Sequence, residues 1–158
     1  MAHFNEYLDL LELSPLVNHC LQNGKKRLYK KGEFFCQTSE VCHNIAYISQ
    51  GSFRYFYLDT EGNKHIIGYS FEKDFVADYE SFTRQTPAII YTEAIKASTV
   101  YQLSYNQLEE FWAATRQNQL LGRKIAENLF CMTYHRLLNL YSASPKIRYQ
   151  ELLKRCPD

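Results

Sequence analysis

The pattern that most restricts the fold of this chain is an alternating run over residues 44–71, NIAYISQGSFRYFYLDTEGNKHIIGYSF. Phe53, Tyr55 and Tyr57 fall on one face of this run, and Gly51 interrupts it. A period of two is typical of β-strands, and DTEGN between two such stretches predicts a hairpin turn. Antiparallel strands joined by tight turns indicate a sandwich or a barrel-like roll.

Weaker strand patterns flank this run on both sides. The segment RLYKKGEFFC predicts two short strands around Lys31 and Gly32, and residues 88–97 and 99–103 predict two more. Between them, residues 74–87 form a polar insert of helical size. The sequence therefore predicts a mainly β fold with flanking helices and one short helical insert.

Two helical stretches precede the first strand. Apolar spacing over residues 4–21 suits an amphipathic helix that is interrupted near Ser14 and Pro15. Ser14 is a suitable cap for a second short helix, with Pro15 at its first position. Asn23 and Gly24 close that second helix.

Longer helices follow the last strand. Ser104 and Gln107 have the spacing of a capping box, which predicts a helix start at this point. Helical periodicity continues to about Tyr141, with a break near residues 116–118, and Pro145 begins a last helix.

The long helix carries an apolar stripe at spacings of three to five residues. A helix of about 25 residues spans roughly 37 Å, which is longer than a small roll covers. Such a stripe is usually core, but here the roll has inner faces of its own to fill. We therefore expect a homodimer seam. The candidate dimerisation residues are Leu121, Ile125, Leu129 and Met132.

Charge and cysteine content exclude several classes of protein. Lys and Arg number 18 against 17 Asp and Glu, so the chain lacks the excess of positive charge that is typical of proteins that bind nucleic acid or anionic membranes. No apolar run suits a signal peptide or a membrane span. The five cysteines form no CxxC pair, and we expect reduced, small buried residues at Cys36 and Cys131 in a cytoplasmic protein.

Motifs for catalysis are missing from the sequence. The five histidines form no HxH or HxxxH pair, and adjacent Cys42 and His43 would point to opposite faces of a strand. There is no GxSxG, no GxxxxGK[ST] and no GxGxxG. We therefore expect a protein that is not an enzyme and has neither a metal nor a cofactor.

Three segments together resemble a known family. YKKGEFFCQTSE, the alternating run through DFVADYESF, and SPKIRYQELL are similar to the sensor half of Crp/Fnr-type transcription regulators, in the branch common in Bacteroidetes. The resemblance implies a double-stranded β-roll of the jelly-roll, cyclic nucleotide-binding-like type, followed by a long dimerisation helix. It divides the chain into N-terminal helices (1–24), an effector-binding roll (25–104) with a helical insert (76–86), the long helix region (105–143) and a last helix with a linker start (144–158).

In this family a helix-turn-helix follows and reads DNA as a dimer. That half is absent from this sequence, and we expect it to follow Asp158 in the natural protein. The alternative is a natural protein without a DNA reader, that is, a stand-alone β-roll that binds a small molecule. A cupin-type metal enzyme is a third alternative, disfavoured by the missing ligand cluster. About 35–60 further residues encoded after Asp158, with two short helices, a tight turn and a basic second helix, would support the regulator. A stop codon there would favour the stand-alone protein.

The family's phosphate-binding cassette is degenerate in this sequence. In cyclic-nucleotide binders the insert opens with Gly-Glu and later carries Arg followed by a small hydroxyl residue. Laying DFVADYESF on that pattern places Ala77 at the Gly, Asp78 at the Glu and Glu80 at a second Gly, and places Ala88 and Ile89 at the Arg and Ser. With acids in place of a guanidinium, cAMP and cGMP are disfavoured, because a phosphate would be repelled.

The effector itself is not identified by the sequence. Arg84 replaces the missing guanidinium only if the insert folds differently from the family pattern. Thr133, counted back without gaps from SPKIRY, falls where the resemblance places a base-contacting hydroxyl on the long helix. The candidate ligand-binding residues are Tyr69, Asp78, Tyr79, Ser81, Tyr91 and Thr133.

Overall fold

The computed structural model describes residues 12–155, and it divides into two compact units. The first unit, Ser14–Phe111, contains both β-sheets and the helices that accompany them. The second unit contains the chain from Trp112 onward, including two helices.

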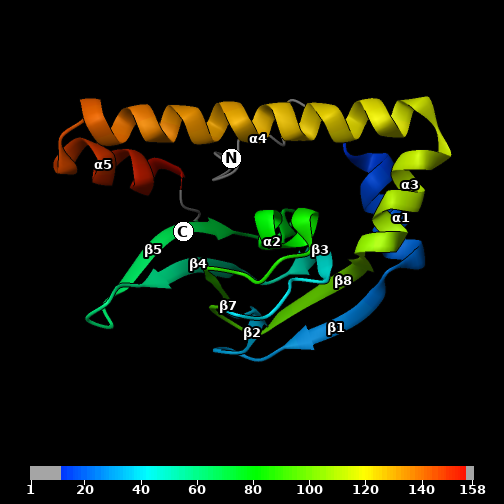
Figure 1. Ribbon diagram of the computed structural model, residues 1–158, viewed down its shortest axis with the longest axis horizontal. Helices are drawn as coiled ribbons and strands as arrows, with labels where there is room; N and C mark the ends of the chain where they lie inside the picture. The colour runs from blue at the N-terminus through cyan, green and yellow to red at the C-terminus, as the bar shows by residue number, and fades with distance from the viewer. Residues whose placement is uncertain (1–11, 156–158) are drawn as a thin grey trace. The chain divides into compact units, whose positions relative to one another are not determined.

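The first unit is built from two four-stranded antiparallel sheets (Figure 1). The first sheet has the order β1-β8-β3-β6, and the second has the order β2-β7-β4-β5. Consecutive strands alternate between sheets at most steps, which produces the double-stranded roll expected from the resemblance. The strands are β1 (Lys25–Tyr29), β2 (Phe34–Cys36), β3 (Asn44–Gln50), β4 (Phe53–Leu58), β5 (Lys64–Ser70), β6 (Phe75–Val76), β7 (Tyr91–Ala94) and β8 (Ser98–Ser104).

The strands confirm most of the sequence prediction, but β7 is shorter than expected. A strand over residues 88–97 is wrong at its start, because Ala88 bonds to a loop and not to a neighbouring strand. Its N–H donates to the Glu40 carbonyl at 2.8 Å, and its carbonyl accepts from the Ser39 N–H at 3.0 Å. The ladder with β4 runs from Tyr91 to Ala94 only.

The inner faces of the two sheets form one apolar core. The period of two in β3 and β4 decides which side chains enter it, because successive residues point to opposite faces. A fully buried side chain of this kind contributes about 1.5–3 kcal/mol to folding. The core contains Tyr29, Ala46, Ile48, Phe53, Val76, Ala94 and Val100, with Phe35 and Tyr55 packed against it.

Two turns of the roll depend on glycine. Gly51, between β3 and β4, has φ +108°, and a Cβ there would collide with Ser98. Gly62, in the hairpin between β4 and β5, has φ +85° with open space around it. Both backbone conformations are disfavoured for residues with a side chain. The interruption at Gly51 and the predicted hairpin at DTEGN are confirmed.

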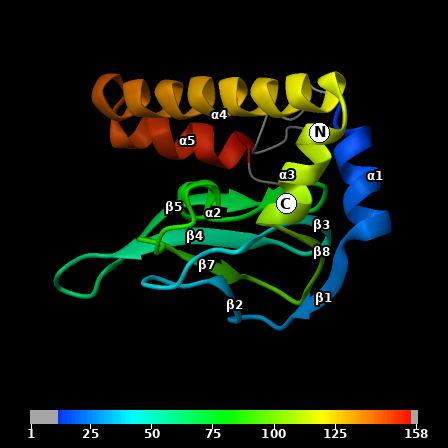
Figure 2. The same ribbon diagram turned by 45° about the vertical axis from the view of Figure 1, so that its right-hand side comes forward.

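Three helices accompany the roll. Helix α1 (Ser14–Asn23) packs against β3 and β8, α2 (Tyr79–Arg84) is the short insert, and α3 (Tyr105–Ala114) follows β8 (Figure 2). The predicted capping box is confirmed, since Gln107 N–H donates to Ser104 Oγ at 3.3 Å and Ser104 N–H donates to Gln107 Oε1 at 2.9 Å. The helix predicted before Ser14 lies largely outside the described residues.

The second unit contains helix α4 (Arg116–Ser142) and helix α5 (Pro145–Arg155). The predicted break before the long helix is present at Thr115, which caps α4 by accepting the Asn118 N–H at 3.0 Å. Pro145 begins α5 as expected. Gly122 allows α4 to approach the Trp112 ring, which an added Cβ would meet at 3.2 Å.

Two apolar stripes run along α4. At 100° per residue the predicted stripe, Leu121, Ile125, Leu129 and Met132, occupies one side of the helix, and all four are half-buried. The opposite side carries Phe130, Tyr134, Leu137 and Tyr141, all exposed. Cys131 is also exposed, so its predicted burial is wrong. Among the described residues, no helix has the length and apolar character needed to cross a bilayer.

Candidate functional site

The interior of the roll near the start of α2 contains a buried carboxylate. Asp78 has an extended backbone and caps α2, with Oδ1 accepting the Ser81 N–H at 3.2 Å. Its exposed fraction is 4%, and Oδ2 has no hydrogen-bond partner among the described residues. Burial raises the pKa of this carboxyl group above its ordinary value, while the Ser81 N–H opposes the shift. One carboxylate oxygen is therefore used structurally and the other is buried and bare.

Ser81 fixes the position of α2 against the roll. Its buried hydroxyl accepts the Cys42 N–H at 2.9 Å and donates to the Thr86 carbonyl at 2.6 Å. These two bonds join the loop before β3 to both ends of the insert. Because both are satisfied inside the protein, the geometry indicates that Ser81 positions Asp78.

A second bare polar atom lies on strand β7. Thr92 of β7 is 0% exposed, and its hydroxyl has no hydrogen-bond partner among the described residues. It pairs in register with Tyr55 of β4 and with Cys36 of β2. Buried hydroxyl groups are almost always bonded, so an orphaned one inside a roll marks a place that another molecule can complete.

A hydrogen-bond chain connects Tyr55 of β4, the ladder partner of Thr92, to the segment that carries Asp78. The Tyr55 hydroxyl lies 2.8 Å from Ser70 Oγ, and Ser70 donates to the Phe75 carbonyl at 2.9 Å. Burial raises the pKa of Tyr55 well above its ordinary value, so the phenol stays protonated and can act as donor to Ser70. Phe75 lies three residues before Asp78 in the chain.

Two buried thiols provide a second connection. Cys36 and Cys42 share a hydrogen bond, which raises the pKa of Cys36 and lowers that of Cys42. The Asp78 charge adds to the raised pKa of Cys36 and opposes the lowering of the Cys42 pKa, so the carboxylate lies near both thiols. Cys36 is the ladder partner of Thr92. Asp78, Thr92, Cys36, Cys42 and Tyr55 therefore belong to one interior cluster, which we call the roll site.

Two arginines near this region are directed away from the roll site. Arg54 pairs in register with Glu93, on the opposite face of the strands from Tyr55 and Thr92, and its guanidinium makes two 3.1 Å bonds to that carboxylate. Arg84 lies 3.7 Å from Glu80 at the surface of α2. Neither guanidinium is therefore in place to hold a buried phosphate.

The positions that carry Arg and a hydroxyl residue in the family pattern do not replace them. Ala88 is buried and Ile89 is 74% exposed. Both side chains are apolar, so neither can form a charge-assisted bond to an anion.

The structure distributes the six predicted ligand residues over different places. Only Asp78 belongs to the roll site, and Ser81 lies beside it, with its N–H donating to Asp78 Oδ1. Tyr69 pairs with Arg54 and stacks on Phe71, and Tyr91 stacks on Phe56 at 5.0 Å, both on the face opposite the roll site. Tyr79 is 45% exposed.

Thr133 lies in the second unit. It is exposed on α4, and its hydroxyl donates to the Leu129 carbonyl at 2.8 Å. That bond is the common internal one for a threonine in a helix. The role predicted for Thr133 from the resemblance stays a prediction.

Sequence reasoning did not select Thr92, Cys36, Cys42, Tyr55 or Ser70. A usable pattern was present at Thr92, since a polar residue between Tyr91 and Glu93 in a strand points away from both. No local pattern indicates which face of the strand is the inner one.

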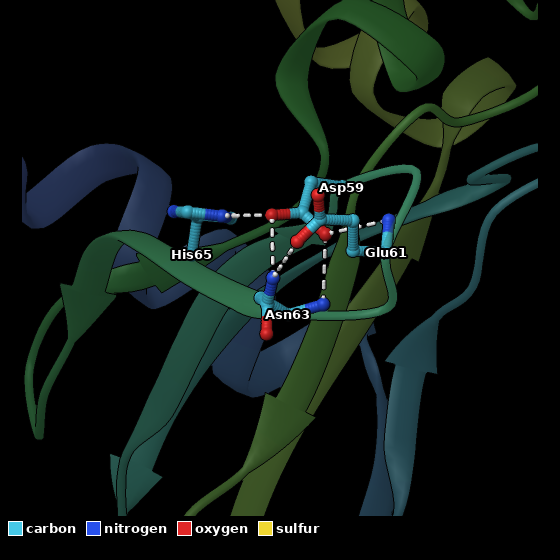
Figure 3. Close-up of polar contacts among 4 residues, drawn as sticks. All are labelled: Asp59, Glu61, Asn63 and His65. Atoms are coloured by element: carbon cyan, nitrogen blue, oxygen red, sulfur yellow. Dashed lines mark hydrogen bonds and ion pairs between the residues drawn. The ribbon is translucent and has the colours of Figure 1, made fainter.

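A separate polar cluster occupies the β4–β5 hairpin (Figure 3). Asp59 accepts a 2.7 Å bond from the His65 ring and a 2.8 Å bond from the Asn63 N–H, and Glu61 lies 3.4 Å from the Asn63 amide. These bonds satisfy the turn. No group of three or more His, Cys, Asp or Glu suited to a metal ion is present in the described part of the chain.

Comparisons with known proteins fit this geometry. The cyclic nucleotide-binding domain family matches residues 26–115, more than half of the 158 residues. Among curated protein sequences none gives a significant match to this chain.

Three solved structures share the fold. The Catabolite Activator Protein of Thermus thermophilus has 14% identity and a TM-score of 0.63 over 85% of this chain and 59% of its own. CLP of Xanthomonas campestris, a c-di-GMP responsive global regulator, has 14% identity and 0.67 over 90% and 71%. CprK in complex with o-chlorophenolacetic acid has 15% identity and 0.63 over 82% and 54%. The chain thus spans 59% of the first of these proteins and 54% of CprK.

Proposed function

The chain belongs to the cyclic nucleotide-binding domain family and has the fold of Crp/Fnr-type regulators, and from this premise we propose that it is the effector-sensing and dimerising domain of a transcription regulator. The observation that carries the proposal is the roll site, where a carboxylate oxygen and a hydroxyl are buried without partners. Binding rather than catalysis is the role, in a cytoplasmic protein whose DNA-reading domain follows α5.

The effector differs from a cyclic mononucleotide. A sugar-phosphate needs a guanidinium and backbone N–H groups at the phosphate, and the roll site presents Asp78 with both nearby arginines bonded elsewhere. Desolvating a phosphate beside a carboxylate costs more than one bidentate contact of about 1.5–3 kcal/mol returns. The fold tolerates this change of ligand, since a relative is named for c-di-GMP and another holds an organic acid.

Signal transmission would use the long helix. We propose that α4 pairs two copies of the chain and that effector binding changes the angle between the paired helices, which re-aims the DNA-reading domains. An apolar face on α4 supports the pairing: Phe130 is 71% exposed and Tyr141 is 85% exposed, and the rings of Phe130 and Tyr134 stack at 6.3 Å. A solvated aromatic face of this kind is typical of a surface that another protein covers.

Two measurements test the proposed sensing role. Isothermal titration with cAMP and with cGMP should give no binding at about 100 µM ligand, a range that detects micromolar affinity. Native mass spectrometry of the purified chain should show a mass excess from a retained small molecule. The excess should be lost in Thr92→Val, which removes a hydroxyl with little change of shape, and kept in Tyr91→Phe on the opposite face.

Micromolar affinity for either cyclic nucleotide would show that the phosphate argument is wrong. If the purified chain retains no small molecule, or if the mass excess persists in Thr92→Val, the roll site is no longer supported as the effector-binding site.

A further inference from the structure

The two bare atoms of the roll site are costly to leave as they are. A buried carboxylate oxygen without a partner destabilises a protein by more than a buried neutral group does, because a charge is more expensive to desolvate. A buried unbonded hydroxyl adds a further, smaller cost. Asp78 Oδ2 and Thr92 Oγ1 are both in this condition. Unsatisfied groups at the start of α2 and on β7, both buried in one roll, indicate a shared ligand.

The two groups are connected through their neighbours. Thr92 is the ladder partner of Tyr55 and Cys36. The hydroxyl of Tyr55 bonds to Ser70, which donates to the Phe75 carbonyl three residues before Asp78. The thiol of Cys36 interacts with that of Cys42, whose N–H donates to Ser81, and the Ser81 N–H donates to Asp78. Two independent routes thus lead from Thr92 to Asp78 within the buried interior.

The charge around Asp78 selects the kind of ligand. Among the described residues, the only charged side chain that acts on its carboxyl group is Glu80, which is also an acid. Arg54 is bonded to Glu93 on the opposite face, and Arg84 is paired with Glu80 at the surface. The interior therefore has an uncompensated negative group and a hydroxyl, which favour a hydrogen-bond donor with a positive charge.

We propose that the roll site binds a small organic cation whose primary ammonium group donates to Asp78 Oδ2 and to Thr92 Oγ1. The rest of the ligand is apolar, because aromatic side chains of the core, Phe53, Phe35 and Tyr55, border this part of the roll. The ammonium neutralises the charge of the buried carboxylate. An alcohol does not neutralise this charge, and a carboxylate ligand adds a second negative charge beside it. This inference rests on the proposed sensing function and narrows its ligand class.

The experiment uses matched probes that differ only in the polar end. Phenethylamine, 2-phenylethanol and phenylacetate form one set, and butylamine, butanol and butyrate form a smaller one. Each is added to the full chain, and the melting temperature Tm is measured. A ligand at ten times its Kd should raise Tm by about 4 °C in a chain of this size. At least one amine should give such a rise, and its alcohol and acid counterparts should not.

Variants assign the rise to the roll site. Asp78→Asn keeps an oxygen for the Ser81 N–H, and Asn caps helices as well as Asp does, so this variant should fold but lose the response. Thr92→Val should reduce the affinity for the amine at least about tenfold, the effect of one hydrogen bond. Glu127→Gln removes an exposed acid of α4 that pairs with Arg123, away from the roll site, and should leave the response unchanged.

The outcomes separate the ligand class from the sensing role. An amine response that persists in Asp78→Asn, or no response to any amine, overturns the cation proposal. If instead an acid or an alcohol raises Tm in a manner that Thr92→Val removes, the roll site is an effector site for another ligand class and only the cation proposal fails. If no probe acts and native mass spectrometry finds no retained molecule, both proposals fail.

Discussion

At the scale of single residues, the polar side chains of this protein differ in how completely their hydrogen-bonding groups are satisfied. The Ser81 hydroxyl both accepts and donates a hydrogen bond within the protein, whereas Asp78 accepts a bond at one carboxylate oxygen and has no partner at the other. At the hairpin, Asp59 is satisfied several times over at the surface. Satisfied polar groups hold a local conformation, and unsatisfied buried ones identify where a ligand is missing.

The first prediction concerns the pKa of Asp59. The His65 ring, and after it the Asn63 side chain and backbone, hold this pKa well below its ordinary value. A depressed carboxyl pKa contributes stability above the unfolded value of about 3.9, and this contribution is lost as the pH falls through the lower folded value. His65→Gln should therefore raise the pKa of Asp59, as measured by carboxyl NMR titration in acid.

Lys64→Gln is the matched control for this titration. Lys64 is adjacent in sequence, but its ammonium contacts Glu93 at 3.4 Å. The control should leave the Asp59 titration close to that of the unmodified chain. An unchanged pKa in His65→Gln would mean that the ring does not hold the carboxylate in solution.

At the scale of elements, the roll is a set of short strands whose turns bring them into register. The ladder between β3 and β8 is antiparallel, and its register shifts between Ile48 and Gln50, just before the Gly51 turn. Ser98 is in contact with that turn, since its hydroxyl accepts the Ser52 N–H at 3.1 Å and donates to the Lys96 carbonyl at 2.9 Å. The turn and the start of β8 therefore form one tightly packed unit.

The second prediction compares two glycines. Gly51→Ala should destabilise the chain by about 3 kcal/mol or more, because the new methyl group combines a disfavoured φ with a collision against Ser98. Gly62→Ala has a similar φ but open space, and should lose only about 1 kcal/mol. Urea denaturation of both variants measures the difference. Equal losses would show that the turn at Gly51 relaxes without breaking the Ser98 bonds.

At the scale of the whole molecule, the proposed sensor needs a partner for α4. The sequence predicted the seam along Leu121, Ile125, Leu129 and Met132, and the structure leaves the opposite face more exposed. Apolar stripes on two sides of one helix allow one side to pack within its own chain and the other to pair. We favour the exposed face for the homodimer, because it loses the larger apolar area from water.

The third prediction distinguishes the two faces by sedimentation. Phe130→Ser combined with Tyr134→Ser should raise the dimer Kd by at least about a hundredfold, since two buried aromatic side chains contribute about 3 kcal/mol or more. Ile125→Ser combined with Leu129→Ser should change the Kd less. A reversed order would restore the stripe predicted from the sequence, and a monomer mass at every concentration would exclude the dimer.

The sequence by itself determined most of the strands, the two glycine turns and the starts of α3 and α5. Each depends on interactions between residues close in the chain, such as the period of two around Tyr55 or the reciprocal bonds of Ser104 and Gln107. It also predicts a degenerate phosphate clamp, because the residue types at the aligned positions can be read from the sequence alone.

Only the tertiary structure decided which residues face the roll site. Alternation in β7 separates Tyr91 from Thr92, but the pairing with Tyr55 and Cys36 on neighbouring strands decides that Thr92 is the inner one. The same pairing turns Arg54 outward to Glu93 and leaves Asp78 without a positive partner. Contacts between residues distant in sequence decide which face of a strand points inward and which partner a side chain bonds to. A local sequence pattern does not contain these contacts.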